Sequence, residues 1–169
     1  AAIGGLAQII ATGLLLHLFS SQSFTVATAL TKTEPIQVAL FAAIFLGELL
    51  GPWPIAAILI ATSGVLLMSW PRKDIGSIGW GPIALGVFSG GLFALSAVGF
   101  RGAILELGSE PFTIRATVTL VLGLTLQSLV LSIWLRWRQP GVLTQILQAW
   151  RPSMLAGFMG ALGSQFWFL

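Results

Sequence analysis

Long apolar runs alternate with short polar connectors along the whole chain. A bilayer core needs about 20 mostly apolar residues in a helix, and the runs of about that length cover residues 3–19, 24–46, 53–70, 80–100, 111–133 and 152–169. Connectors such as "SSQS", "GELLGP" and "RGAILELGSE" are short, so consecutive helices are expected to be antiparallel neighbours. The pattern predicts an all-α membrane protein, a polytopic helical bundle with six spans.

The composition agrees with this class. Of the 169 residues, 56% are hydrophobic and 8% are charged, whereas a soluble domain carries about 25% charged residues. The net charge of +3 comes mainly from short connectors, without a basic patch interleaved with aromatic residues. We therefore expect lipid as a partner and no nucleic acid. The chain has no cysteine, which excludes disulfides, thiolate metal sites and cysteine nucleophiles.

Tryptophan and basic residues mark the ends of the predicted spans. Indole rings gather at the headgroup level of a bilayer, and a soluble bundle does not predict their placement near six span ends: Trp53, Trp70, Trp80, Trp134, Trp137 and Trp150. Five basic residues follow the third and fifth spans, against Arg101 on the opposite side, which predicts that the Lys/Arg-rich side is cytoplasmic. These five are Arg72, Lys73, Arg136, Arg138 and Arg151.

Two further patterns concern helix packing. In the longer connector, "GVLTQILQAW" places apolar residues on one helical face; a short helix lying in the membrane interface and a plain loop both remain open. Small residues recur at four-residue spacing, which lets helix backbones approach closely. One row is Gly86 and Gly90, and the other is Ala156, Gly160 and Ser164.

Two opposite charges lie in the second span. Lys32 and Glu34 each cost about 2.5–3.5 kcal/mol at such a depth on insertion scales. At about 100° per residue they point about 200° apart, so they cannot pair on a straight helix. Each therefore needs a partner on another helix or access to water. A substrate or ion pathway fits this arrangement, and charges that only fix helix packing are the alternative.

Pro35 follows these charges directly. It cannot donate to the carbonyl of Thr31, so the helix is expected to bend and free a backbone acceptor near the midplane. Transporters build their sites at such interrupted helices. Gln37 shares a helical face with Glu34. The sequence therefore predicts a pathway lined by Lys32, Glu34, Pro35 and Gln37, with Thr31 as a further candidate.

Arg115 is a further pathway residue, and the remaining polar residues are weaker candidates. Arg115 lies about one turn into the fifth span, where it either snorkels to the interface or reaches inward as a counter-charge to Glu34. His17 is the single histidine. Gln127 and Gln165 are expected to form hydrogen bonds between helices rather than bind ligands, with Gln165 kept as a secondary site candidate.

Catalytic and metal sites are not expected. Ser89 in "GVFSGG" lacks the GxS pattern of a serine nucleophile, because residue 87 is Val, and no histidine is placed to activate it. Metal-ligand clusters and phosphate loops are also missing from the sequence. The chain is therefore not expected to be an enzyme or to hold a cofactor.

The run "FTVATALTKTEPIQVALFAAIFLGELLGPWPIAAILIATSGVLLMSW" resembles the EamA-domain family of the drug/metabolite transporter superfamily. The matching features are an alanine-rich helix, the proline at Pro35, "FLGE" ending at Glu48, and a helix closing on "GVLLM". "GPIALGVFSGGLFALSAVGFRGA" and "PFTIRATVTLVLGL" look like the start of a second repeat, and Arg115 falls where that family often carries an arginine.

The resemblance implies ten spans built as two inverted five-helix repeats. On that map the chain is an internal fragment holding spans three to eight. Residues 1–73 are the last three helices of the first repeat, and residues 74–169 are the first three of the second. The family's usual orientation places the basic connectors outside, opposite to the charge count. The site is implied at the repeat interface, where Glu34 and Lys32 would face.

These features predict a secondary transporter, a permease or exporter moving a small polar metabolite such as an amino acid by alternating access. It would be a multi-pass protein of the cell (inner) membrane. Glu34 is the candidate proton-linked carboxylate, and Lys32 or Arg115 would bind an anionic substrate group. The alternative is a non-transporting membrane scaffold or sensory protein whose buried charges serve helix packing.

Overall fold

The computed structural model describes residues 1–69 and 79–168, and all the regular secondary structure in this part of the chain is helical. The all-α class predicted from the apolar runs is therefore confirmed for this part of the chain. In order, the helices are α1 (Ala2–Ser21), α2 (Phe24–Thr31), α3 (Glu34–Phe41), the π-helix η1 (Ala42–Leu46), α4 (Pro52–Ser69), α5 (Trp80–Glu106), α6 (Phe112–Arg138), α7 (Val142–Gln148) and α8 (Trp150–Phe168).

Four helical segments are long and apolar enough to cross a membrane, judged by length and composition: Ala2–Ser21, Phe24–Leu46, Trp80–Glu106 and Phe112–Arg138. The second of these combines α2, α3 and η1. A shorter apolar helix covers Pro52–Val65 within α4. The chain is therefore a helical membrane protein with four helices of spanning length in its described part.

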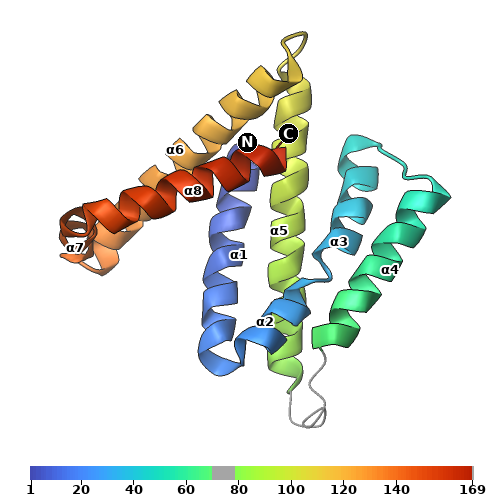
Figure 1. The fold of residues 1–169 in the computed structure, drawn as a ribbon, viewed down its shortest axis with the longest axis horizontal. Helices are drawn as coiled ribbons and strands as arrows, with labels where there is room; N and C mark the ends of the chain where they lie inside the picture. The colour runs from blue at the N-terminus through green and yellow to red at the C-terminus, as the bar shows by residue number, and fades with distance from the viewer. Residues whose placement is uncertain (70–78, 169) are drawn as a thin grey trace.

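Helices α1 and α5 lie side by side and run in opposite directions (Figure 1). Small residues allow their backbones to come close: a Cβ added at Gly4 would lie 2.9 Å from the carbonyl oxygen of Ser96. Further along the contact, the buried Ser89 donates its hydroxyl to the carbonyl of Ala11 at 2.9 Å. This hydrogen bond explains why a serine is tolerated at this buried position, because its hydroxyl has a partner on the neighbouring helix.

The other side of α5 receives the segment between α2 and α3. A Cβ at Gly86 would overlap the Cβ of Leu30, and one at Gly90 would lie 2.9 Å from the carbonyl oxygen of Thr31. The close approach predicted for Gly86 and Gly90 is therefore confirmed. Because only glycine leaves room there, α5 fixes where α2 ends.

The second row of small residues does not act in the same way. Nothing in the described part of the chain lies within 4 Å of a Cβ built at Gly160, and Ala156 is exposed. The close packing predicted for this row is therefore wrong within the described residues. Small residues permit a close approach but do not cause one. Helix α8 instead meets α6 through a hydrogen bond from Gln165 Nε2 to Thr117 Oγ1 at 2.9 Å, which is the interhelical role expected for Gln165.

The structure decides between the two readings of the longer connector and moves the end of the fourth span. Residues 142–148 form α7, so the helical reading of "GVLTQILQAW" is confirmed and the plain loop is wrong. The fourth span was expected to end at residue 100, but α5 continues to Glu106. Arg101 therefore lies in a helix rather than in a connector. The apolar stretch after it, with Ile104 buried, gives the helix a reason to continue.

The tryptophans lie at helix ends, as expected from the sequence. Trp53, Trp80 and Trp137 are each at least 85% exposed at an end of α4, α5 or α6. Trp134 and Trp150 occupy similar positions on α6 and α8. Trp70, the basic pair Arg72 and Lys73, and the proposed repeat boundary between residues 73 and 74 lie outside the described residues.

Candidate functional site

The helix of the second span is interrupted where the charges lie. Helix α2 ends at Thr31, Lys32 and Thr33 form a turn, and α3 begins at Glu34. The N–H of Lys32 closes α2 with a short-range bond to the carbonyl of Ala29, at 3.0 Å. Pro35 falls in the first turn of α3, where its missing N–H costs no helical hydrogen bond. The interruption expected from Pro35 is therefore confirmed, as a full break just before the proline rather than a bend.

Two of the predicted pathway residues stabilise this break. Gln37 donates from Nε2 to Thr33 Oγ1 at 3.1 Å and to the carbonyl of Val87 at 3.2 Å, which ties the start of α3 to α5. The buried Thr31 donates its hydroxyl to the carbonyl of Thr28 at 2.9 Å. In this structure both side chains therefore hold the backbone of the break in place.

Glu34 borders a cavity of about 380 Å³ between α1, α3, α5 and α8. Three more polar side chains line it, from three different helices: Gln8, Ser96 and Ser164. The carboxylate of Glu34 accepts no hydrogen bond from another residue in the described part of the chain, where the one ion pair lies elsewhere. Binding pockets for small molecules have volumes of about 300–1,000 Å³. The cavity therefore offers a ligand-sized space with an anionic wall.

Sequence reasoning missed Gln8 as part of this site. Its Oε1 accepts a hydrogen bond from Gln127 Nε2 at 2.7 Å, and the same Nε2 lies 3.4 Å from the carbonyl of Gly5. The interhelical role predicted for Gln127 is confirmed by these contacts. An uncharged polar residue in the middle of an apolar run was the available signal, because such groups in a membrane need a partner.

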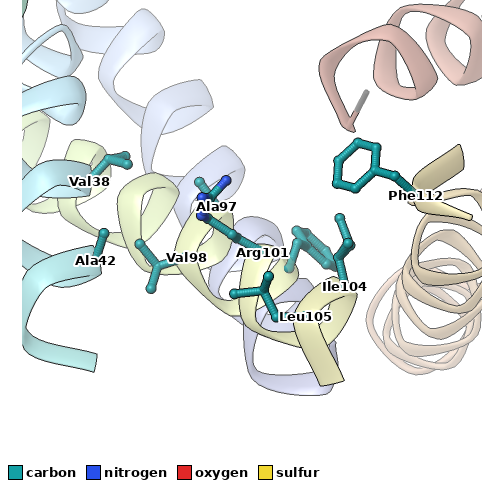
Figure 2. A pocket seen from close by; sticks show the side chains of 9 residues that line it. Val38, Ala42, Ala97, Val98, Arg101, Ile104, Leu105 and Phe112 are labelled. Atoms are coloured by element: carbon teal, nitrogen blue, oxygen red, sulfur yellow. The ribbon is translucent and has the colours of Figure 1, made fainter. Parts of the chain in front are cut away.

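A second, more apolar compartment of about 240 Å³ adjoins the first. Val38 and Ala42 border it from α3 and η1, and Phe112 closes it from the start of α6 (Figure 2). Ala97 and Phe100 line both compartments, so these two residues form the shared wall. The site therefore combines a polar space at Glu34 with an apolar space beside it.

Arg101 borders the apolar compartment and is held by Glu48. Its Nε lies 2.8 Å and 3.1 Å from the two carboxylate oxygens of Glu48, and its Nη2 lies 3.0 Å from one of them. Glu48 follows η1 and Gly47, whose φ of 68° places it in the left-handed region that favours glycine. The pair therefore joins the connector after η1 to α5.

A signal for this pair was present in the sequence. The second and fourth spans run in the same direction, so their C-terminal ends, which carry Glu48 and Arg101, lie on the same side. The ion pair was not predicted, because Arg101 was assigned to a connector instead of to the end of this helix.

We expect the Arg101–Glu48 pair to contribute modestly to stability. The Arg101 side chain is 57% exposed, and exposed ion pairs are worth about 0.2–1 kcal/mol. Arg101→Gln and Glu48→Gln should each lower the melting temperature in detergent slightly, and the double variant should cost no more than the larger single change. A double-mutant cycle measures this coupling. Strictly additive effects would contradict a contribution from the pair.

The structure does not bring Arg115 to Glu34. Arg115 Nη1 lies 3.4 Å from the carbonyl of Ile104, and its guanidinium lies 5.7 Å from the centre of the Phe112 ring. Its Nε is buried without a hydrogen-bond partner among the described residues. A cation near the C-terminal end of α5 is favoured by the helix dipole. Arg115 therefore joins the end of α5 to the start of α6.

Lys32 and His17 lie at exposed positions. Lys32 lies in the turn, two residues before Glu34, and it lines neither of the two compartments. His17 lies near the end of α1, and its backbone carbonyl accepts the hydroxyl of Ser20 at 2.7 Å. Of the sequence candidates, Glu34 is therefore the one that faces the polar cavity.

Within residues 1–69 and 79–168, no three His, Cys, Asp or Glu side chains gather as metal ligands would. No family model, curated protein or solved structure matches the chain.

Proposed function

We propose that the chain is part of a secondary transporter that moves a small polar metabolite, such as an amino acid or a related compound, by alternating access. The observation that carries the proposal is the carboxylate of Glu34, which borders a cavity of about 380 Å³ at a helix break. It lies at the eleventh of the 23 residues of the segment Phe24–Leu46. A carboxylate at such depth is costly and marks a substrate or ion pathway by default.

The packing around the break favours transport over a purely structural role. A buried charge that serves packing is paired with an opposite charge, whereas Glu34 has no ion-pair partner within 4 Å among the described residues. The break also divides the span into two short helices that meet at Lys32 and Thr33. Two short helices can change their relative tilt while each stays intact, which is what alternating access requires.

The proposal extends to the architecture implied by the EamA resemblance. Helices α4 and α8 are 18 and 19 residues long, which at 1.5 Å per residue is about 27–28 Å, close to the thickness of a bilayer core. They would serve as the third and sixth spans here, within a ten-span protein of two inverted repeats. We place this multi-pass protein in the cell (inner) membrane, with Glu34 as the group that couples transport to protons.

A non-transporting scaffold or sensory protein is the second candidate. The Arg101–Glu48 pair and the Gln8–Gln127 hydrogen bond favour it, because both join different helical segments, as residues that serve helix packing do. In that case the charges at the break would stabilise the fold and no substrate would move.

Transport currents test the proposal. The protein is reconstituted in proteoliposomes, and currents are recorded on a solid-supported membrane against amino acids, organic acids and amines, with and without a pH gradient. We expect a current for at least one class of compound that grows with the gradient. The absence of current for every compound, together with a loss of stability on replacing Lys32 or Glu34, would support the scaffold instead.

A further inference from the structure

The two compartments differ in the charged side chains that line them. Among the described residues that line the polar cavity, Glu34 is the one that carries a charge. In the apolar compartment the charged residue is Arg101, and its guanidinium is already bound by Glu48 through three contacts of 2.8–3.1 Å. The site therefore presents a carboxylate without a paired cation beside an apolar space.

Among the described residues, a substrate carboxylate would find no unpaired cation lining these compartments. Lys32 lines neither of them, and the guanidinium of Arg115 is directed to the carbonyl of Ile104 and the ring of Phe112. A carboxylate placed near Glu34 would also meet a like charge, which is unfavourable at short range. An ammonium group would meet an opposite charge and a charge-assisted hydrogen bond.

The apolar compartment has room for the rest of such a molecule. Val38, Val98 and Ile104 line it (Figure 2). It shares Ala97 and Phe100 with the polar cavity. The apolar compartment on the far side of this wall has a volume of about 240 Å³. Burial of apolar surface there adds to affinity in proportion to the area removed from water.

We infer that this site binds primary amines that carry an apolar body and no carboxylate, with the ammonium at Glu34 and the body beside Val38, Val98 and Ile104. The inference rests on the proposed transport function, and it narrows the substrate class from small polar metabolites to apolar amines. It also assigns a role to Ala97, whose small side chain would let the amine extend from one compartment into the other.

Matched ligand pairs test this without any change to the protein. Binding to the detergent-solubilised protein is measured by titration calorimetry for 2-phenylethylamine against phenylalanine and for 3-methylbutylamine against leucine. Each pair differs by one carboxylate. We expect the amine to bind at least about ten-fold more tightly, and methylamine, which lacks the body, to bind more weakly than either amine. Equal or tighter binding of the amino acids, or no binding of any amine, would overturn the inference.

A variant of the wall adds an independent test. Ala97→Leu places a larger side chain between the two compartments, so 3-methylbutylamine should lose affinity about ten-fold or more while methylamine changes little. Ala84→Leu, on the exposed side of the same helix, is the matched control and should change neither. Equal losses for both amines, or none, would count against the apolar compartment as the place of the body.

Failure of the inference and failure of the proposed transport function give different results. Currents driven by amino acids but not by the amines would reject the amine class and keep transport. Tight binding of the amines to a protein that carries no current would keep the site and reject transport.

Discussion

Replacement of Glu34 by glutamine is expected to remove substrate-driven current while leaving the protein at least as stable as the wild type. Glutamine has the same shape without the charge, so it cannot form the charge-assisted bond to a cationic group, which is worth about 1.5–3 kcal/mol, or about ten- to a hundred-fold in affinity. Removal of a charge from the span also removes an insertion cost of about 2.5–3.5 kcal/mol. Currents and the melting temperature in detergent measure the two effects.

The combination of these two results distinguishes a pathway charge from a packing charge. Glu110→Gln is the matched control, because Glu110 is exposed in the connector between α5 and α6 and should keep both current and stability. Wild-type transport by Glu34→Gln with an unchanged pH dependence would remove Glu34 from the pathway. A clear fall in melting temperature for Glu34→Gln alone would show instead that the carboxylate stabilises the bundle.

The helical architecture could be predicted from the sequence, because lipid offers the backbone no hydrogen-bond partners. Peptide groups in a bilayer must satisfy their hydrogen bonds internally, so a long apolar run implies a helix. The predicted run 24–46 coincides with α2, α3 and η1 together. The end of α5 was missed because a single charged residue, Arg101, does not stop a helix whose next turn, with Ile104, is still buried.

The site was accessible only in part. Glu34 could be selected because a carboxylate in an apolar run needs an explanation wherever the chain folds. Its neighbours Gln8, Ser96 and Ser164 come from three other helices, and no local pattern says which faces of those helices meet. Arg115 was expected near Glu34 because the two side chains carry opposite charges. Its guanidinium instead contacts the carbonyl of Ile104 near the end of α5 and the ring of Phe112.

The place of the break shows how local and tertiary effects combine. Pro35 predicts an interruption, since it removes one helical bond at Thr31. The residue at which α2 ends depends on α5, because Leu30 and Thr31 pack closely against Gly86 and Gly90. A glycine pair in the sequence predicts a close contact without naming the partner.

Substitution of Gly86 by alanine is therefore expected to destabilise the protein and to impair transport together. The new Cβ would overlap the Cβ of Leu30 and lie 3.4 Å from the backbone carbon of the same residue. Neither atom is the end of a flexible side chain, so α2 and α5 must separate. Overpacking of this kind costs about 1–3 kcal/mol, and a chain of this size loses about 2–4 °C in melting temperature per kcal/mol.

The displacement also reaches the site, because Leu30 precedes the turn that leads to Glu34 by only a few residues. Gly81→Ala in the same helix is the control: nothing lies within 4 Å of its Cβ, and alanine favours a helix over glycine by about 0.8–1.0 kcal/mol. That variant should melt at the wild-type temperature or above it and should transport normally. If Gly86→Ala behaves like Gly81→Ala, α2 and α5 are not in close contact. The close contact then does not determine the position of the break or of Glu34.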